Sequence, residues 1–150
     1  MSKLPITSDP AFTTAQLPQD AEERIYLAQI WHEIANLPLL QRRAYLLNFT
    51  DGAIEWFWFY GIASIRKIGQ TLQLTNEQFN RLWVLLEWHE ESRERARLLT
   101  DPEEKFALLW QQLPLNDLTI AALLATTQQN VFQLRQAARQ HLRRTLGREA

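Results

Sequence analysis

The sequence contains no cysteine and only four glycines in 150 residues. Without cysteine the chain has no disulfide, no thiolate metal site and no cysteine nucleophile, which fits a reducing cytoplasm. Because glycine is scarce and polar and apolar residues do not alternate regularly, helices are favoured over sheets. We therefore expect an all-α protein, a small helical bundle without the β-wing of winged-helix proteins.

Long apolar runs are also missing. The longest candidate, residues 54–62, is about half the length of a membrane span and carries Glu55. Residues 1–19 show no charged segment followed by an apolar core, so they do not resemble a secretory signal. Their three prolines and weak periodicity predict a disordered leader instead. We expect a cytoplasmic protein with no membrane partner.

Motifs for catalysis, cofactors and metals are absent as well. His32, His89 and His141 are far apart in the sequence and have no ligand spacing. There is no glycine-rich phosphate loop, no nucleophile elbow and no pair of carboxylates with a pocket signal. We therefore expect no enzyme activity, no metal, no cofactor and no small-molecule substrate.

Charge is distributed unevenly although the net charge is only −1. Residues 1–105 hold eleven Lys/Arg and fifteen Asp/Glu, a balance of −4, whereas residues 106–150 hold five Arg and two acids, a balance of +3. All five of these arginines lie between Arg135 and Arg148. Two interpretations are equally open on charge alone: a local anion-binding surface, or a solvated basic end of a helix.

Apolar periodicity, capping residues and prolines together predict the positions of the helices. The expected helices cover residues 21–36, 39–49, 64–72, 75–88, 102–114, 117–125 and 128–146. We divide the chain into a first helical unit, residues 20–90, a connector, residues 91–104, and a second unit, residues 105–150. The aromatic segment 54–60 has Glu55 and no basic residue, so it is expected to face the core or a protein partner rather than single-stranded nucleic acid.

Two segments, residues 68–82 and 120–134, match at an offset of 52 positions. Each is expected to form a short helix, a three-residue turn and a second helix capped by Thr75 or Thr127, which is the helix-turn-helix pattern. A small residue, Gly69 or Ala121, stands where the two helices of each unit are expected to approach closely. The sequence thus predicts two helix-turn-helix units, at residues 64–88 and 117–146.

The segments Leu37–Leu47 and Ile120–Leu146 together resemble region four of the sigma-seventy superfamily of bacterial RNA polymerase sigma factors. The first has the leucine-proline, glutamine-arginine and leucine-rich order of the family's opening helix, and the second has its isoleucine-alanine, leucine, turn, threonine and valine order. The resemblance implies an all-helical DNA-binding protein whose partners are double-stranded promoter DNA and RNA polymerase core. Gln73 and Ala125 depart from the family, which usually has glycine in the turn. Nothing in the chain resembles region two, so it is either part of a longer sigma factor or a freestanding regulator.

The helix 128–146 is the expected recognition helix. Its apolar stripe, Val131, Leu134, Ala138 and Leu142, is expected to dock on the preceding helix. The other faces carry residue types that bind bases and phosphates in the major groove. The predicted base contacts are Gln128, Gln129, Phe132, Gln133 and Gln136, and the predicted phosphate contacts are Thr127, Arg139, Arg143 and Arg144.

The first unit is the poorer candidate for DNA binding. Its second helix continues into the apolar residues 82–86, although Glu77 and Arg81 match Gln129 and Gln133 in position. This unit is expected to pack inside the protein or to bind a protein partner. The alternative function is therefore a sigma-derived protein-interaction module that docks on RNA polymerase or on another sigma factor without specific DNA binding.

Overall fold

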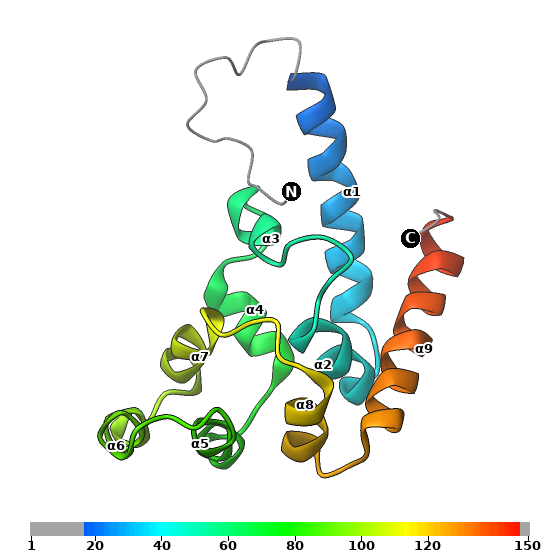
Figure 1. The fold of residues 1–150 in the computed structure, drawn as a ribbon. Helices are drawn as coiled ribbons and strands as arrows, with labels where there is room; N and C mark the ends of the chain where they lie inside the picture. Colours follow the sequence, from blue (N-terminus) through cyan, green and yellow to red (C-terminus); the bar gives the residue numbers. More distant parts are fainter. Residues whose placement is uncertain (1–16, 148–150) are drawn as a thin grey trace.

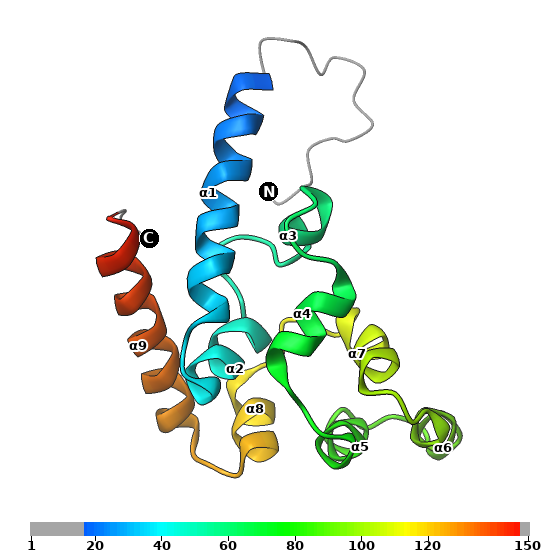
Figure 2. The ribbon, with the colours of Figure 1, turned by 180° about the vertical axis from the view of Figure 1, so that it is seen from behind.

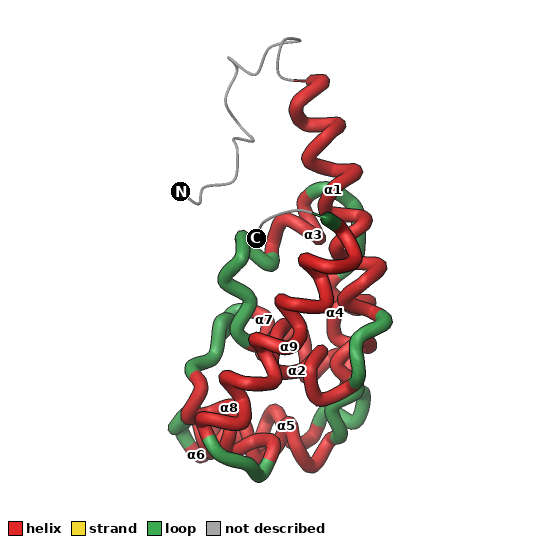
Figure 3. The backbone as a smooth tube through the Cα atoms, turned by 90° about the vertical axis from the view of Figure 1, so that its right-hand side faces the viewer, coloured by secondary structure: helices red, strands yellow, loops and turns green. Residues whose placement is uncertain are grey.

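The computed structural model describes residues 17–147, and that part of the chain is built from α-helices and loops without a strand (Figures 1 and 3). The expected all-α fold is confirmed. Along the chain the helices are α1 (Leu17–Ala35), α2 (Leu39–Leu47), α3 (Glu55–Phe59), α4 (Ile65–Leu72), α5 (Asn76–Leu85), α6 (Glu90–Leu98), α7 (Pro102–Trp110), α8 (Asp117–Leu124) and α9 (Gln128–Leu146). The predicted leader falls mostly outside the described residues, and α1 already begins at Leu17.

Local sequence signals define most helix ends. Thr75 and Gln78 form a reciprocal capping box at the start of α5. Asp101 caps α7 by accepting a hydrogen bond from the Glu103 N–H, with proline at the first helical position. Gly147 follows α9 in the left-handed conformation, at φ 69°. These caps were predicted from the sequence and are confirmed.

The segment after Trp88, open from the sequence to either a solvated helix or a mobile connector, forms the helix α6, and α7 begins at Pro102 as expected. The α6 helix is almost entirely polar, but it carries ion pairs from Arg95 to Glu91 at 3.9 Å and from Arg97 to Glu94 at 2.9 Å. It buries one small apolar residue, Ala96, and packs on α5. A charged sequence therefore forms a helix here because neighbouring turns pair their charges and a single apolar contact anchors it.

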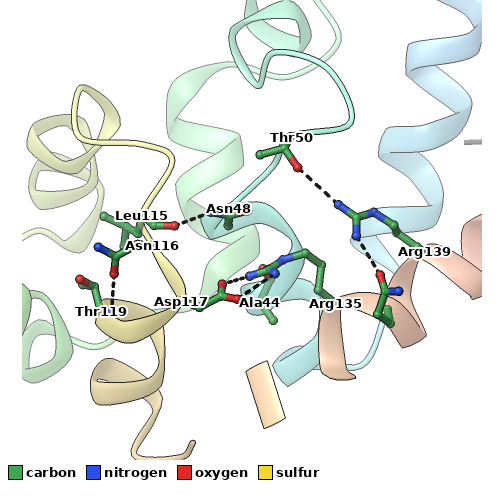
Figure 4. Close-up of polar contacts among 10 residues, drawn as sticks. Ala44, Asn48, Thr50, Leu115, Asn116, Asp117, Thr119, Arg135 and Arg139 are labelled. Atoms are coloured by element: carbon green, nitrogen blue, oxygen red, sulfur yellow. Dashed lines mark hydrogen bonds and ion pairs between the residues drawn. The ribbon is translucent and has the colours of Figure 1, made fainter. Parts of the chain in front are cut away.

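The end of α2 and the start of α8 are far apart in the sequence but are joined by hydrogen bonds in the structure. The Leu115 N–H donates to the Leu47 carbonyl at 2.8 Å, and the Asn48 side-chain amide donates to the Leu115 carbonyl at 2.6 Å (Figure 4). The end of α2 thus lies beside the start of α8, and α9 packs on α1, α2 and α8. We call α1, α2, α8 and α9 the four-helix unit and residues 49–114, which contain α3 to α7, the inserted segment.

This arrangement corrects the predicted division of the chain. Units at residues 20–90 and 105–150 were expected to follow one another, but the four-helix unit takes its helices from both. Figures 1 and 2 show α9 on one side of α1 and α2, and the inserted helices on the other. The contact of α2 with α9 joins residues about ninety positions apart, as in the 91-position hydrogen bond from Arg135 to Ala44, and helical periodicity carries no information at that range.

The core joins the inserted segment to the four-helix unit. Phe57 of α3 is fully buried, and its ring centroid lies 5.4 Å from that of Trp31 on α1 and 5.4 Å from that of Phe49. The aromatic segment 54–60 was expected to face either the core or a protein partner, and Phe57 shows that it contributes to the core. Trp58 and Phe59 of the same helix remain 51% and 37% exposed.

Gly69 makes a close contact with α7, although it was expected to lie where α4 approaches α5. A Cβ atom at Gly69 would lie 2.7 Å from the Phe106 ring of α7. The small residue therefore allows α4 to approach α7, not α5. In keeping with this, α4 packs on α7 and α2, whereas α5 packs on α6, α7 and α8.

Candidate nucleic-acid interface

The turn between α8 and α9 fixes where the candidate recognition helix begins. Ala125 has left-handed dihedrals, φ 58° and ψ 49°, and the Thr126 N–H donates to the Ala121 carbonyl at 2.9 Å. Thr127 then caps α9, because its hydroxyl accepts a hydrogen bond from the Asn130 N–H at 3.0 Å. The Thr127 side chain, predicted to contact phosphate, thus has a structural partner as well as an exposed position.

The buried face of α9 is the predicted one, with one change. Val131, Ala138 and Leu142 are buried, while Leu134 is half-buried. On α8 the sequence indicates Leu124 as the core residue of the pair, but Leu123 is buried, at 1% exposed, and Leu124 is only half-buried. The α8 sequence is apolar on almost every side, so no polar face distinguished these two leucines.

The predicted base-contacting residues share the free face of α9. Gln128, Gln129, Gln133 and Gln136 are exposed, and Phe132 is 50% exposed. Arg143 and Arg144 are exposed on the same side, further along the helix, and neither has an ion-pair partner within residues 17–147. This face therefore offers amide groups for base edges, one aromatic ring, and two cations free for phosphates.

Arg139, also predicted to contact phosphate, is bonded within the protein. Its Nη2 donates to the Thr50 hydroxyl at 3.3 Å (Figure 4). Its Nε donates to Asp51 at 3.0 Å and its Nη1 to the Gln136 Oε1 at 2.8 Å. Its side chain is only 20% exposed. Tyr45 completes this network by donating from its hydroxyl to Asp51 at 2.7 Å. Burial and the Asp51 carboxylate raise the pKa of Tyr45, so the phenol stays protonated and serves as a donor.

Arg135 is a structural residue that the sequence analysis counted only as part of the basic cluster. It is 6% exposed, forms a bidentate ion pair with Asp117 at the start of α8, and donates from Nε to the Ala44 carbonyl of α2 at 3.3 Å (Figure 4). This one side chain ties together three helices of the four-helix unit. Its spacing of four residues from Val131 places it beside the buried stripe, which is the signal that indicates its role.

The second helix of the first helix-turn-helix buries an apolar face inside the protein. Phe79 and Trp83 of α5 are buried, and the stacked rings of Trp83 and Trp88 have centroids 4.5 Å apart. Arg81 donates to the Leu123 carbonyl at 2.9 Å, so it satisfies the end of α8. The α5 helix therefore packs against α8 through its buried face, one of the two roles expected of this unit, while Glu77 and Arg81 remain exposed.

Comparison with models of protein families, with curated proteins and with solved structures gives no match to this chain. Within residues 17–147 no helix has the length and apolar character needed to cross a bilayer. The same residues contain no group of three or more His, Cys, Asp and Glu side chains placed to hold a metal ion.

Proposed function

We propose that the chain is a sigma-factor-like protein of bacterial transcription initiation that binds the upstream promoter element through α9. The observation that carries the proposal is the free face of α9, where a row of exposed glutamines is followed by Arg143 and Arg144. Glutamine can pair with adenine in the major groove, the Phe132 ring can contact a thymine methyl group, and arginine can hold phosphates. The partners in this proposal are double-stranded promoter DNA and RNA polymerase core.

The course of the chain supports the proposed descent. The segments that resemble region four, Leu37–Leu47 and Ile120–Leu146, are separated in sequence by the inserted segment. In the fold they form α2, α8 and α9. Helix α9 packs on both α2 and α8, and the Leu47–Leu115 hydrogen bond joins the end of α2 to the start of α8. If the inserted segment is set aside, an opening helix runs directly into a helix-turn-helix, the order that the resemblance implies.

Titration of fluorescent duplexes with the 150-residue protein over a salt series tests the proposal. Gln133→Ala is expected to cost roughly 1–3 kcal/mol on the best site and much less on random DNA, because a base contact is lost. Arg144→Gln is expected to weaken binding to all duplexes and to lower the salt slope by about one. Arg95→Gln, an exposed arginine on α6, is the matched control and should change neither quantity. Equal binding to all sequences with no salt dependence would refute the proposal.

The protein-interaction function is the second candidate, and the exposed aromatic residues of α3 favour it. Trp58 and Phe59 are large apolar side chains left partly in solvent on the inserted segment, away from α9. Trp58→Ala is expected to weaken binding to RNA polymerase or to another sigma factor without changing the affinity for duplex DNA. Pull-down with purified polymerase, measured beside the duplex titration, separates the two functions.

A further inference from the structure

The side-chain amide of Gln136 is held in one orientation by Arg139. The guanidinium Nη1 donates to the Gln136 Oε1 at 2.8 Å. A guanidinium has donors and no acceptor, so the amide atom that faces it must be the oxygen. The orientation of this amide is thus fixed by the chemistry of its partner, which resolves the usual ambiguity between the oxygen and nitrogen of glutamine.

Arg139 in turn is fixed by the loop that opens the inserted segment. Its Nε lies 3.2 Å and 3.0 Å from the two carboxylate oxygens of Asp51, and its Nη2 lies 3.3 Å from the Thr50 hydroxyl. Asp51 is held from behind by the Tyr45 hydroxyl at 2.7 Å. Anchors on two different nitrogens, Nε and Nη2, leave the guanidinium little freedom to turn toward a phosphate.

We infer that Arg139 is a positioning residue and that Gln136 presents its two N–H groups to the major groove, selecting a base pair rich in acceptors, guanine foremost. The inference rests on the proposed DNA binding by α9. Guanine offers two neighbouring acceptors, N7 and O6, to a donor group. Adenine requires the amide oxygen to accept from N6 while the amide nitrogen donates to N7. Because the amide oxygen already accepts from Arg139 and is turned toward it, its N–H groups are the atoms left facing the groove, which favours the guanine pairing over the adenine pairing.

The other glutamines of α9 provide the contrast within the same helix. Gln128, Gln129 and Gln133 are exposed, and none of them hydrogen-bonds to another side chain within residues 17–147. Their amides are free to rotate and to pair with adenine. The loop at Thr50 and Asp51 therefore sets the preference at one base-pair position, although neither residue lies on the recognition helix.

Selection from randomised duplexes, followed by binding to duplexes that differ only at the Gln136 position, tests this inference. That position is the one at which Gln136→Ala abolishes the base preference. The unmodified protein should favour guanine over adenine there by on the order of tenfold. Arg139→Met frees the amide oxygen and should move the preference toward adenine. Arg144→Met is the matched control, because it removes an arginine without touching a glutamine, and should weaken binding to all four duplexes alike.

A measurement without DNA keeps the inference falsifiable. In ¹⁵N NMR spectra of the free protein, the side-chain amide of Gln136 should differ from that of Gln133, and Arg139→Met should remove the difference. An unchanged order of the four bases in Arg139→Met, or an unchanged Gln136 amide signal, would overturn the inference. A third outcome separates the two proposals. If Arg139→Met removes the amide difference but the unmodified protein binds no duplex preferentially, the Gln136–Arg139 contact exists, and the proposed DNA binding is refuted together with the base selection that rests on it.

Discussion

The turn between α4 and α5 and the turn between α8 and α9 have nearly the same backbone. Gln73 has φ 52° and ψ 37°, and Ala125 has φ 58° and ψ 49°. The hydroxyls of Thr75 and Thr127 accept hydrogen bonds from the N–H three residues on, at 3.1 Å and 3.0 Å. The similarity of the two sequences over these few positions is thus matched by similar local geometry.

The helices that follow the two turns have different surroundings. Helix α5 ends at Leu85, Glu87 turns the chain with φ 60°, and α6, α7 and α8 pack around it. Helix α9 continues for 19 residues and keeps one face free. At the matching position 52 residues apart, both side chains are buried: Trp83 by apolar packing and Arg135 by its ion pair with Asp117. The turn is a local property, whereas exposure of the second helix depends on residues far from the motif.

The largest effects should come from those two buried positions. Trp83→Ala is expected to cost about 4 kcal/mol of unfolding free energy, because it leaves a cavity. Asp117→Ala should cost about 3 kcal/mol, because Arg135 then lies buried without its counter-charge. The double variant Asp117→Leu with Arg135→Met should recover much of the loss, since both charges are removed together. Urea unfolding measures all of these, and failure of the double variant to recover would show that the pair does more than balance charge.

The two helix-turn-helix units also differ in packing at the small residue of their first helix, Gly69 or Ala121. Gly69→Ala is expected to cost about 1–2 kcal/mol, because overpacking against Phe106 outweighs the better helix propensity of alanine. The cost should shrink in a Phe106→Leu background, which gives the new methyl group room. In the second unit the matching residue is already alanine, Ala121, and it is buried without conflict. A cost for Gly69→Ala that is the same in both backgrounds would contradict the α4–α7 contact.

The network behind α9 predicts a dependence on alkaline pH. The pKa of Tyr45 is raised above the ordinary value of 10.0 by burial and by Asp51, so the folded protein retains this proton after the unfolded chain has lost it. Its stabilising contribution is complete below pH 10 and is lost as the pH rises, at up to about 1.4 kcal/mol per pH unit. Urea unfolding between pH 9 and 11 measures this slope. Tyr45→Phe should have the smaller slope, and equal slopes would exclude Tyr45 as the cause.

The smallest effects concern the turns themselves. Gln73→Gly and Ala125→Gly should each stabilise the protein by up to about 1 kcal/mol, because glycine adopts the left-handed conformation without the cost that other residues bear. Equal gains in thermal unfolding would show that the two turns are alike in energy as well as in geometry. Gln70→Gly, inside α4, is the control and should destabilise by about 1 kcal/mol. A gain at only one of the two turns would show that turns with similar backbone geometry differ in energy.

The sequence predicts those parts of the molecule that depend on neighbouring residues. Most of the helices, the caps at Thr75 and Asp101 and the unusual turn positions Gln73 and Ala125 follow from local patterns, whereas α3 and α6 were not among the expected helices. The partners of Arg135 and Arg139 do not, because Asp117 and Asp51 lie 18 and 88 positions away. From the sequence alone, both arginines look like free cations. In the described residues, however, only Arg143 and Arg144 of the predicted phosphate-binding arginines have no ion-pair partner.

The junction between Asn48 and Leu115 has a consequence for the order in which the protein folds. Its hydrogen bond spans 67 positions, and closing a loop of that length costs about 1.7 kcal/mol more chain entropy than closing one of ten residues. During synthesis, α2 emerges long before α9, the helix that packs most extensively on it. Helix α9 comes last among the described helices, so α2 has to wait for the end of synthesis before its partner exists. The surface proposed to bind DNA can therefore be completed only on a chain that has been made almost to its end.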